Sequence, residues 1–381
     1  MNQPPAQPFN FLGNAFNQML VNPRSPEKDK KDQADLKISF EKKYGDKNYF
    51  LVPSSGSSES EKVSVKLIAL HRDAVMNSAA RVNAFFKLNF ENQVLNFGSV
   101  LPLFHVAALG TYARAFLTKS KIVQCAWNPD QFVSWVDTHK INIISLVPTQ
   151  LFDLVERNIL APKSLKIVFV GSSKLSLDLF QKAELLHWPL IETYGMTETS
   201  SMIAAAQEKM EVFPDVEVAL VDQKLKIKCN SLMTCAVQRI GGEIQFKNLE
   251  NGWLQTEDLV SITSEKEKYF LEFLGRESDF VKISGEGVSV ANLREVFGSF
   301  KHSALVALPD DRTGYEIVLV SETNEDKQEI SEKIERYNFL VRPFEKIKKL
   351  YRVLELPRTS LGKTKFKILE ETIKGLAYEI I

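Results

Sequence analysis

The sequence predicts an α/β protein with a large N-terminal domain and a small, mobile α+β C-terminal domain. Three observations support this fold class. Short apolar strands alternate with amphipathic helices from His71 to Ile191, which is typical of a mostly parallel sheet with helices on its faces. After Ser200 the pattern changes to short strands separated by turns, which indicates a small β-rich subdomain. A compact mixture of helices and strands follows from about Arg276.

The alternation begins with a helix at 71–87, where Val75, Ala79, Val82 and Phe86 share one helical face. Pro129 is suited to the first position of a helix, and Ser176 is a suitable N-cap. In order, we expect strands at 94–101, 122–125, 141–147, 165–170 and 188–191, and helices at 106–117, 129–138, 149–157 and 176–186.

The sequence also predicts the character of the N-terminal region, the domain boundary and the later strands and helices. Residues 1–46 are polar and contain several prolines, so we expect a loosely packed arm, followed by a strand at 47–52. We place the domain boundary between residues 276 and 277, giving domains 1–276 and 277–381. The expected later elements are strands at 216–221, 225–228, 242–247, 269–273, 303–307 and 316–321, helices at 290–297 and 327–337, and a terminal helix from Lys367.

Bulk composition excludes several functional classes. Lys plus Arg and Asp plus Glu number 48 each, so no global basic field favours nucleic-acid binding. The three cysteines, Cys125, Cys229 and Cys235, do not form a disulfide framework or a metal motif. No apolar run reaches the ~20 residues of a membrane helix, and the N-terminus lacks the features of a secretory signal. We therefore expect a cytoplasmic protein without membrane insertion.

Two segments carry the most specific chemistry. Tyr194-Gly195-Met196-Thr197-Glu198 follows an apolar stretch and places a hydroxyl and a carboxylate at a strand end, where open α/β sheets bind ligands. Far downstream, a polar, turn-rich loop presents Lys363. A carboxylate able to bind a metal and a lysine on a loop are the groups that a nucleotide-activating enzyme requires.

From about Ser54 onward, these motifs and their order resemble the acyl-adenylate-forming superfamily, which includes acyl-CoA synthetases and luciferases. The resemblance implies that a carboxylic acid attacks the α-phosphate of ATP, releases pyrophosphate, and is then passed to the thiol of coenzyme A. It implies Mg2+ held by Glu198, adenine stacked on Tyr194, and a phosphate oxygen bound by Thr197.

The resemblance assigns further residues to the nucleotide. Glu59, Glu61 and Glu257 stand where relatives usually have glycine or proline, which makes their effect on the phosphates and the ribose an open question. The expected phosphate loop is Ser55, Gly56, Ser57 and Ser58 with Lys62. Asp258 and Arg276 are expected to bind the ribose, and Gly171 and Ser172 to border the adenine. Lys363 is expected to bridge the carboxylate and the α-phosphate.

The same resemblance implies a rotation of the C-terminal domain between the two half-reactions. Gly285 and Glu286 lie in a segment similar to the loop that lines the thiol tunnel for CoA. The acidic hinge residue of relatives is replaced by Ser278, with Asp279 beside it, so either residue is a candidate for the hinge.

Three local segments resemble the o-succinylbenzoate–CoA ligases of menaquinone biosynthesis: 101–106 with Gly110 and Arg114, 145–151, and 284–287. His105 is expected to gate the acyl site or orient the carboxylate; the alternative is a buried, satisfied histidine. Arg114 is expected to pair with the second carboxylate of a diacid, since a guanidinium suits bidentate recognition; the alternative is a surface arginine. Ser173 is expected to border the aryl pocket.

Alternatives remain open at this stage. One alternative is another ligase of the same superfamily that acts on an aryl or medium-chain acid, and an adenylation domain that feeds a carrier protein is a further candidate. A non-catalytic nucleotide- or acyl-binding relative is a different class, suggested by the departures in the motifs and by the short region before Ser54. A homodimer is one way to cover the sheet face that this short region leaves exposed.

Overall fold

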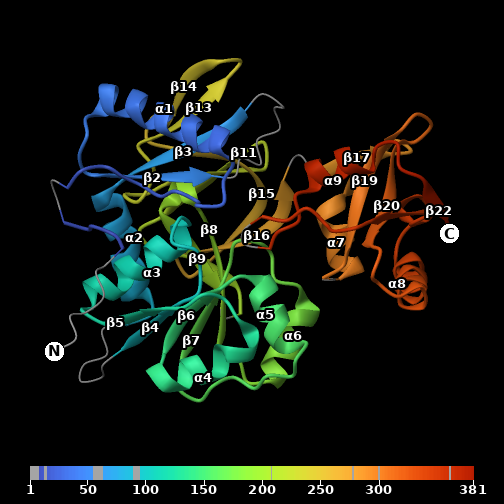
Figure 1. Ribbon diagram of the computed structural model, residues 1–381, viewed down its shortest axis with the longest axis horizontal. Helices are drawn as coiled ribbons and strands as arrows, with labels where there is room; N and C mark the ends of the chain where they lie inside the picture. The colour runs from blue at the N-terminus through green and yellow to red at the C-terminus, as the bar shows by residue number, and fades with distance from the viewer. Residues whose placement is uncertain are drawn as a thin grey trace. The chain divides into compact units, whose positions relative to one another are not determined.

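The structure is a computed structural model. It describes residues 8–12, 15–54, 63–88, 95–206, 208–276, 279–298, 301–359 and 362–381, with only the backbone for 63–65. These residues form two compact units (Figure 1). The first unit comprises 1–172, 183–256 and 262–271, and the second comprises 173–182, 257–261 and 272–381.

An eleven-stranded mixed sheet forms the framework of the large part of the chain. Its strand order is β11-β12-β15-β16-β10-β9-β8-β7-β6-β4-β5. The run from β8 to β5 is parallel, as the alternation in the sequence predicts. The strands of this run are β4 (Asn96–Ser99), β5 (Lys121–Gln124), β6 (Ile143–Leu146), β7 (Ile167–Val170) and β8 (Leu190–Met196).

Each connection between these consecutive parallel strands contains a helix. Because β5 lies on one side of β4, and β6, β7 and β8 lie on the other, the strand order reverses between β4 and β6. Open α/β sheets commonly bind ligands at such a reversal, beyond the carboxyl ends of the strands. The helices are α2 (Arg72–Phe85), α3 (Val106–Leu117), α4 (Pro129–His139), α5 (Pro148–Val155) and α6 (Leu177–Leu185).

Beyond β8 the sheet becomes antiparallel, and a second sheet lies in the same part of the chain. The predicted turn-rich β region is confirmed by its short strands. The additional strands of the large sheet are β9 (Ser201–Ala206), β10 (Met210–Val212), β11 (Glu217–Val221), β12 (Lys224–Lys228), β15 (Leu254–Glu265) and β16 (Lys268–Arg276).

The second sheet has the strand order β1-β2-β3-β13-β14. Its strands are β1 (Gln18–Met19), β2 (Tyr49–Ser54), β3 (Val63–His71), β13 (Cys235–Ile240) and β14 (Glu243–Asn248).

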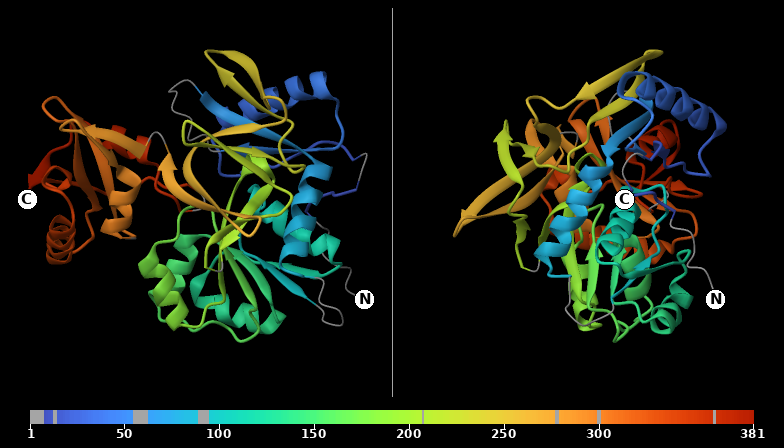
Figure 2. Two further views of the ribbon diagram at one scale, coloured as in Figure 1. Left: turned by 180° about the vertical axis from the view of Figure 1, so that it is seen from behind. Right: turned by 90° about the vertical axis from the view of Figure 1, so that its left-hand side faces the viewer.

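The prediction of a loosely packed arm at 1–46 is wrong for the residues of this range that the structure describes. Helix α1 (Glu27–Tyr44) runs along β3 and β13, as Figure 2 shows. Its Leu36 and Phe40 are fully buried against that sheet. The rest of α1 is mostly charged, so only a narrow apolar stripe marks it as a packed helix.

The segment before α1 is also anchored. The buried Arg72 at the start of α2 donates to the backbone carbonyls of Asn10 (2.6 Å) and Phe16 (2.8 Å). Phe9 packs edge-on against Tyr112 of α3, with ring centroids 5.2 Å apart. Aromatic burial and hydrogen bonds to a charged donor both stabilise this contact, so the early residues support the helix that follows His105.

The second unit has its own core and its own four-stranded sheet, with the order β19-β20-β21-β22. A two-strand hairpin precedes it, and the strand β22 follows the predicted terminal helix. The elements are β17 (Phe280–Ile283), β18 (Glu286–Ser289), α7 (Val290–Phe297), β19 (Ser303–Asp310), β20 (Gly314–Glu322), α8 (Lys327–Leu340), β21 (Lys349–Val353), α9 (Phe366–Ile373) and β22 (Tyr378–Ile380). Among the helices of the described residues, none is long and apolar enough to cross a membrane.

Candidate active site

The motif around Gly195 is fixed by an unusually close approach of two strands. The pairing of β8 with β9 shifts register between Tyr194 and Gly195. A Cβ atom at Gly195 would lie 2.2 Å from the Ser201 carbonyl oxygen, so this position accepts only glycine. The Thr199 hydroxyl accepts the Met196 N–H at 3.1 Å and donates to the Ser201 carbonyl at 2.6 Å. The chain therefore leaves β8 through a rigid bend that holds Thr197 and Glu198 at the strand end.

Glu198 forms an ion pair that the sequence did not indicate. It lies in a short 3-10 turn, Thr197–Thr199, and its Oε1 is 2.7 Å from the Nζ of Lys66 in β3. Both side chains are less than one-fifth exposed. The backbone carbonyl of Glu198 also accepts the Met233 N–H at 2.7 Å, which fixes the carboxylate from behind.

The residues around Glu198 suit a magnesium ion that is bound together with phosphate. Mg2+ is commonly held by one or two carboxylates plus substrate phosphate oxygens, and Glu198 provides one such carboxylate. No group of three or more His, Cys, Asp or Glu side chains able to hold a metal occurs among the described residues. The donor set therefore fits an ion that arrives with the nucleotide, and Lys66 balances the Glu198 charge until then.

In the second unit, three of the predicted residues share one electrostatic environment. The buried carboxylate of Asp258 accepts a hydrogen bond from Arg276 Nε at 2.9 Å. Burial, together with the Arg276 charge, lowers the pKa of Lys363 to about 8, against the opposing effect of Asp258. Two cations beside one carboxylate leave an excess positive charge, which a phosphate group can neutralise.

Glu257 departs from the expected glycine, but it does not intrude on this cluster. Its side chain is exposed, whereas Asp258, one position later on β15, is buried. Neighbouring residues on a strand point to opposite faces, so the two carboxylates are directed apart. The substitution therefore leaves the position of Asp258 intact.

The other predicted residues of the large sheet follow the carboxyl ends of neighbouring strands. His105 comes after β4 and is the N-cap of α3, with its ring 4.5 Å from the Phe104 ring, centroid to centroid. Gly171 and Ser172 come after β7, next to β8 with Tyr194, and Ser172 has a left-handed φ of 82°. Adjacent strands are about 4.8 Å apart, so β4, β6, β7 and β8 span roughly 14 Å at this edge. Ser173 follows directly and is exposed.

Arg114 is not a surface residue. Its side chain is 1% exposed, and Nη2 donates to Thr111 Oγ1 (2.9 Å) and to Ser145 Oγ (3.2 Å). In the described part of the chain, its Nε and Nη1 atoms have no hydrogen-bond partner. Burial lowers the pKa of Arg114 to about 10, which still leaves it charged at neutral pH. A buried guanidinium with two unsatisfied nitrogens is suited to an anionic ligand group.

The predicted CoA loop is the turn of a hairpin. Ser284 and Gly285 connect β17 to β18 with φ values of 52° and 86°, which is the geometry of a two-residue hairpin turn. Gly285 supplies the left-handed conformation at no steric cost. Glu286 begins β18 and is exposed.

Two groups of predicted residues fall wholly or partly outside the described residues. The phosphate loop, Ser55, Gly56, Ser57, Ser58 and Lys62, lies outside them, and so does Ser278. Asp279 is described: its carboxylate accepts the Arg276 N–H at 3.1 Å and a hydrogen bond from Arg294 at 3.3 Å. The Asp279 carboxylate therefore links the end of β16 to α7.

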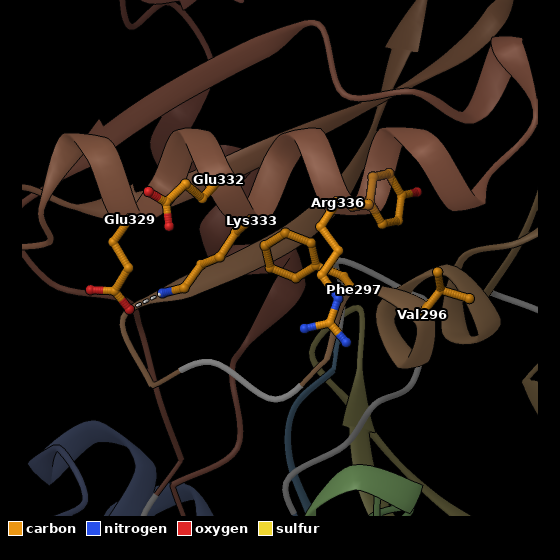
Figure 3. A pocket seen from close by; sticks show the side chains of 7 residues that line it. Val296, Phe297, Glu329, Glu332, Lys333 and Arg336 are labelled. Atoms are coloured by element: carbon orange, nitrogen blue, oxygen red, sulfur yellow. Dashed lines mark ion pairs between the residues drawn. The ribbon is translucent and has the colours of Figure 1, made fainter.

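A pocket of about 300 Å3 lies between α7 and α8 of the second unit (Figure 3). Val296 and Phe297 of α7 face Lys333, Arg336 and Tyr337 of α8. Lys333 pairs inside the unit with Glu325 at 2.6 Å and Glu329 at 2.8 Å. The predicted site residues do not line this pocket, and of its charged lining residues Lys333 and Glu329 are paired with each other.

Lys66 is the functional residue that sequence reasoning missed. The expected lysine of the phosphate loop is Lys62, but the lysine that reaches Glu198 is four positions later. The hairpin register pairs Lys66 with Ser54, at the start of the predicted phosphate loop. An explicit pairing of 49–54 with the following strand would have indicated this position from sequence.

Comparisons with known proteins agree with these motifs. Residues 64–248 match the family described as AMP-binding enzyme. A 2-succinylbenzoate–CoA ligase from Staphylococcus epidermidis is 27% identical over 286 residues, which cover 71% of this chain and 60% of the relative. A ligase of the same name from Staphylococcus aureus is 27% identical over 307 residues, covering 75% and 60%. The chain thus spans about 60% of the length of these relatives.

Solved structures show the same fold. One is o-succinylbenzoate CoA synthetase from Bacillus subtilis in complex with an acyl-adenylate intermediate, with a TM-score of 0.70 and 20% identity, covering 84% of this chain and 68% of that one. Another is ATP-bound MatB from Rhodopseudomonas palustris, with a TM-score of 0.68 and 17% identity, covering 86% and 68%. The resemblance to adenylate-forming enzymes that the motifs predicted is confirmed, and so is the α/β fold, whereas the mobility of the C-terminal domain stays a prediction.

Proposed function

From the match of residues 64–248 to the AMP-binding enzyme family and from the shared fold, we propose that this chain is an ATP-dependent, AMP-forming acid–CoA ligase. The observation that carries the proposal is the cluster of Asp258, Arg276 and Lys363, whose excess positive charge suits a nucleotide phosphate. We further propose that the acid is o-succinylbenzoate, as in the relatives named above.

The two half-reactions use different residues. In the first, a carboxylate oxygen of the acid attacks the α-phosphorus of ATP, and pyrophosphate leaves. The Lys363 ammonium stabilises the charge that develops on the α-phosphate, Asp258 accepts hydrogen bonds from the ribose hydroxyls, and Tyr194 stacks on the adenine. Glu198 would hold the Mg2+ that accompanies ATP, and the ion would supply neutralisation of phosphate charge. In the second, the CoA thiol attacks the acyl carbonyl and AMP leaves.

The proposal includes a mobile C-terminal domain, 277–381, that rotates between these steps about Ser278 or Asp279. After the rotation, Gly285 and Glu286 line the path of the CoA thiol. A homodimer and a cytoplasmic location also remain predictions from the sequence.

The test of the function is pyrophosphate release with Mg·ATP and o-succinylbenzoate, with benzoate and octanoate measured in parallel. We expect selective release with o-succinylbenzoate and, on adding CoA, formation of its thioester. Release with a different acid would keep the reaction class and reject the substrate. ATP binding without release for any acid would favour the non-catalytic relative.

Arg114 provides a test of the substrate. Because o-succinylbenzoate has a second carboxylate, the unsatisfied nitrogens of Arg114 are expected to bind it. Arg114→Met keeps most of the side-chain volume and removes the charge, so we expect KM for o-succinylbenzoate to rise at least about tenfold, since breaking a buried charge pair costs about 2–5 kcal/mol.

The matched controls for this variant are KM for ATP and the thermal unfolding temperature. We expect both to change little, because replacing a buried charge by an apolar side chain is often neutral or stabilising. If Arg114 were structural only, the variant would lower the unfolding temperature and leave the KM for the acid unchanged.

The pH profile tests the role of Lys363. Since the pKa of Lys363 is lowered to about 8, its ammonium form is lost as the pH rises through that value. We expect kcat/KM for pyrophosphate release to fall above a pH of about 8, because this ratio reports the ionisation of the unliganded enzyme. Lys363→Arg, which stays charged, should remove this alkaline decline from the residual activity. An identical decline in both proteins would assign it to another group.

A further inference from the structure

The loop that carries Lys363 is held by backbone hydrogen bonds of its own. Thr359 N–H donates to the Lys363 carbonyl at 2.7 Å, and Lys365 N–H donates to the Pro357 carbonyl at 2.7 Å. The Thr359 hydroxyl accepts the Lys363 N–H at 3.1 Å. We call residues 357–365 the Lys363 loop; these bonds join its described residues, 357–359 and 362–365, but they do not attach the loop to the sheet of the second unit.

The attachment is made by Glu322, at the end of β20. This residue is 7% exposed. Its Oε1 accepts the N–H of Leu356, the residue directly before the loop, at 3.0 Å. Its Oε2 lies 2.6 Å from Nδ1 of His302, which precedes β19. One buried carboxylate therefore ties together the start of β19, the end of β20 and the entry to the Lys363 loop.

Arg358 extends this attachment into the loop. Its Nη1 donates to the Gly362 carbonyl at 2.9 Å, next to Lys363, and its Nη2 donates to the Lys301 carbonyl beside His302. Burial alone would raise the pKa of Glu322, but the Leu356 N–H, the His302 ring and the Arg358 charge hold its pKa below its ordinary value. Glu322 is thus ionised at neutral pH, and its charge interacts favourably with the Arg358 guanidinium, which binds the loop through the Gly362 carbonyl.

We propose that Glu322 is a positioning residue for Lys363: through Leu356, His302 and Arg358 it fixes the Lys363 loop in the geometry that acyl-adenylate formation requires. The inference rests on the proposed role of Lys363. A small misplacement of a charged group costs a large share of its effect, since electrostatic stabilisation requires a preorganised donor. Thiolation does not use Lys363, so it should not depend on Glu322.

The test is Glu322→Gln, which keeps the shape and removes the charge. We expect adenylate formation, measured as pyrophosphate release, to slow about tenfold or more, because misplacement of about 1 Å can cost up to a hundredfold. Thiolation of a supplied acyl-adenylate should change less than about twofold, within the range of a surface substitution. Glu316→Gln is the matched control, because Glu316 also lies on β20 and pairs with Lys349, away from the Lys363 loop.

A second measurement does not depend on activity. Hydrogen exchange at the amides of Leu356, Gly362, Lys363 and Lys365 should become faster in Glu322→Gln and stay unchanged in Glu316→Gln. His302→Asn, at a more exposed side chain, should shift exchange in the same direction to a smaller extent. Because His302→Asn leaves Glu322 in place, it keeps the proposal testable even if Glu322→Gln does not fold.

The outcomes separate this inference from the proposed function. Equal slowing of both half-reactions, or unchanged adenylation with unchanged loop exchange, would overturn the positioning role. If the wild-type chain released no pyrophosphate with any acid, the proposed function would fail. Exchange at the loop amides would then decide whether Glu322 anchors the loop.

Discussion

Lys363→Ala is expected to slow adenylate formation about 10²–10³-fold, the usual cost of removing one preorganised donor to a developing oxyanion. The physical reason is that Lys363 adds a second positive charge beside Asp258, whose carboxylate is already paired with Arg276. Thiolation of a supplied acyl-adenylate should stay within about twofold of wild type, because no charge develops at phosphorus in that step. Rapid-quench measurement of the two half-reactions separates these effects.

Lys365→Ala is the matched control for this prediction. Lys365 is exposed and belongs to the same loop, and its backbone N–H, which donates to the Pro357 carbonyl, is retained in the variant. Lys365→Ala removes one positive charge from the loop but retains the Lys363 ammonium beside Asp258. A loss of rate equal to that of Lys363→Ala, or an equal loss in both half-reactions of Lys363→Ala, would contradict the assigned role.

The sequence predicted the parts of the fold in which each element has a strong local pattern. The strands β4 to β8 are short, apolar and separated by helices, so alternation alone gave their order and their parallel arrangement. The candidate residues His105 and Gly171 could be placed at one sheet edge because each follows such a strand, and Tyr194 lies near the carboxyl end of β8 at the same edge. Carboxyl ends of parallel strands always meet at the same edge, so no long-range information was needed.

The sequence could not predict features that depend on tertiary packing. Helix α1 shows only Leu36 and Phe40 as a narrow apolar stripe among charges, so its burial depends on the sheet that it covers. Arg114 and Lys66 are common surface residue types, and only the packing around them reveals a buried guanidinium and an ion pair with Glu198. Charged residues are almost never fully buried without a partner, so a surface arginine was a reasonable alternative for Arg114, and its burial removes that alternative.

Gly195→Ala is expected to destabilise the first unit by about 1–3 kcal/mol or more, the cost of overpacking a closed site. The added Cβ would lie 2.2 Å from the Ser201 carbonyl oxygen and 2.5 Å from the Met202 Cα atom. Both are backbone atoms of β9, so relief requires the β8–β9 pairing to separate. That movement would also displace Tyr194 and Glu198, so nucleotide binding should weaken together with stability.

Two other glycines provide a graded control, measured by thermal unfolding of the full chain. Gly98→Ala would place its Cβ 2.8 Å from the tip of the Trp135 side chain, which can shift, so we expect a smaller loss of stability. Gly287→Ala meets nothing within 4 Å and should cost least. If Gly195→Ala were as stable as Gly287→Ala, β9 would have to yield easily, and the bend after β8 would not be the rigid support on which the placement of Glu198 depends.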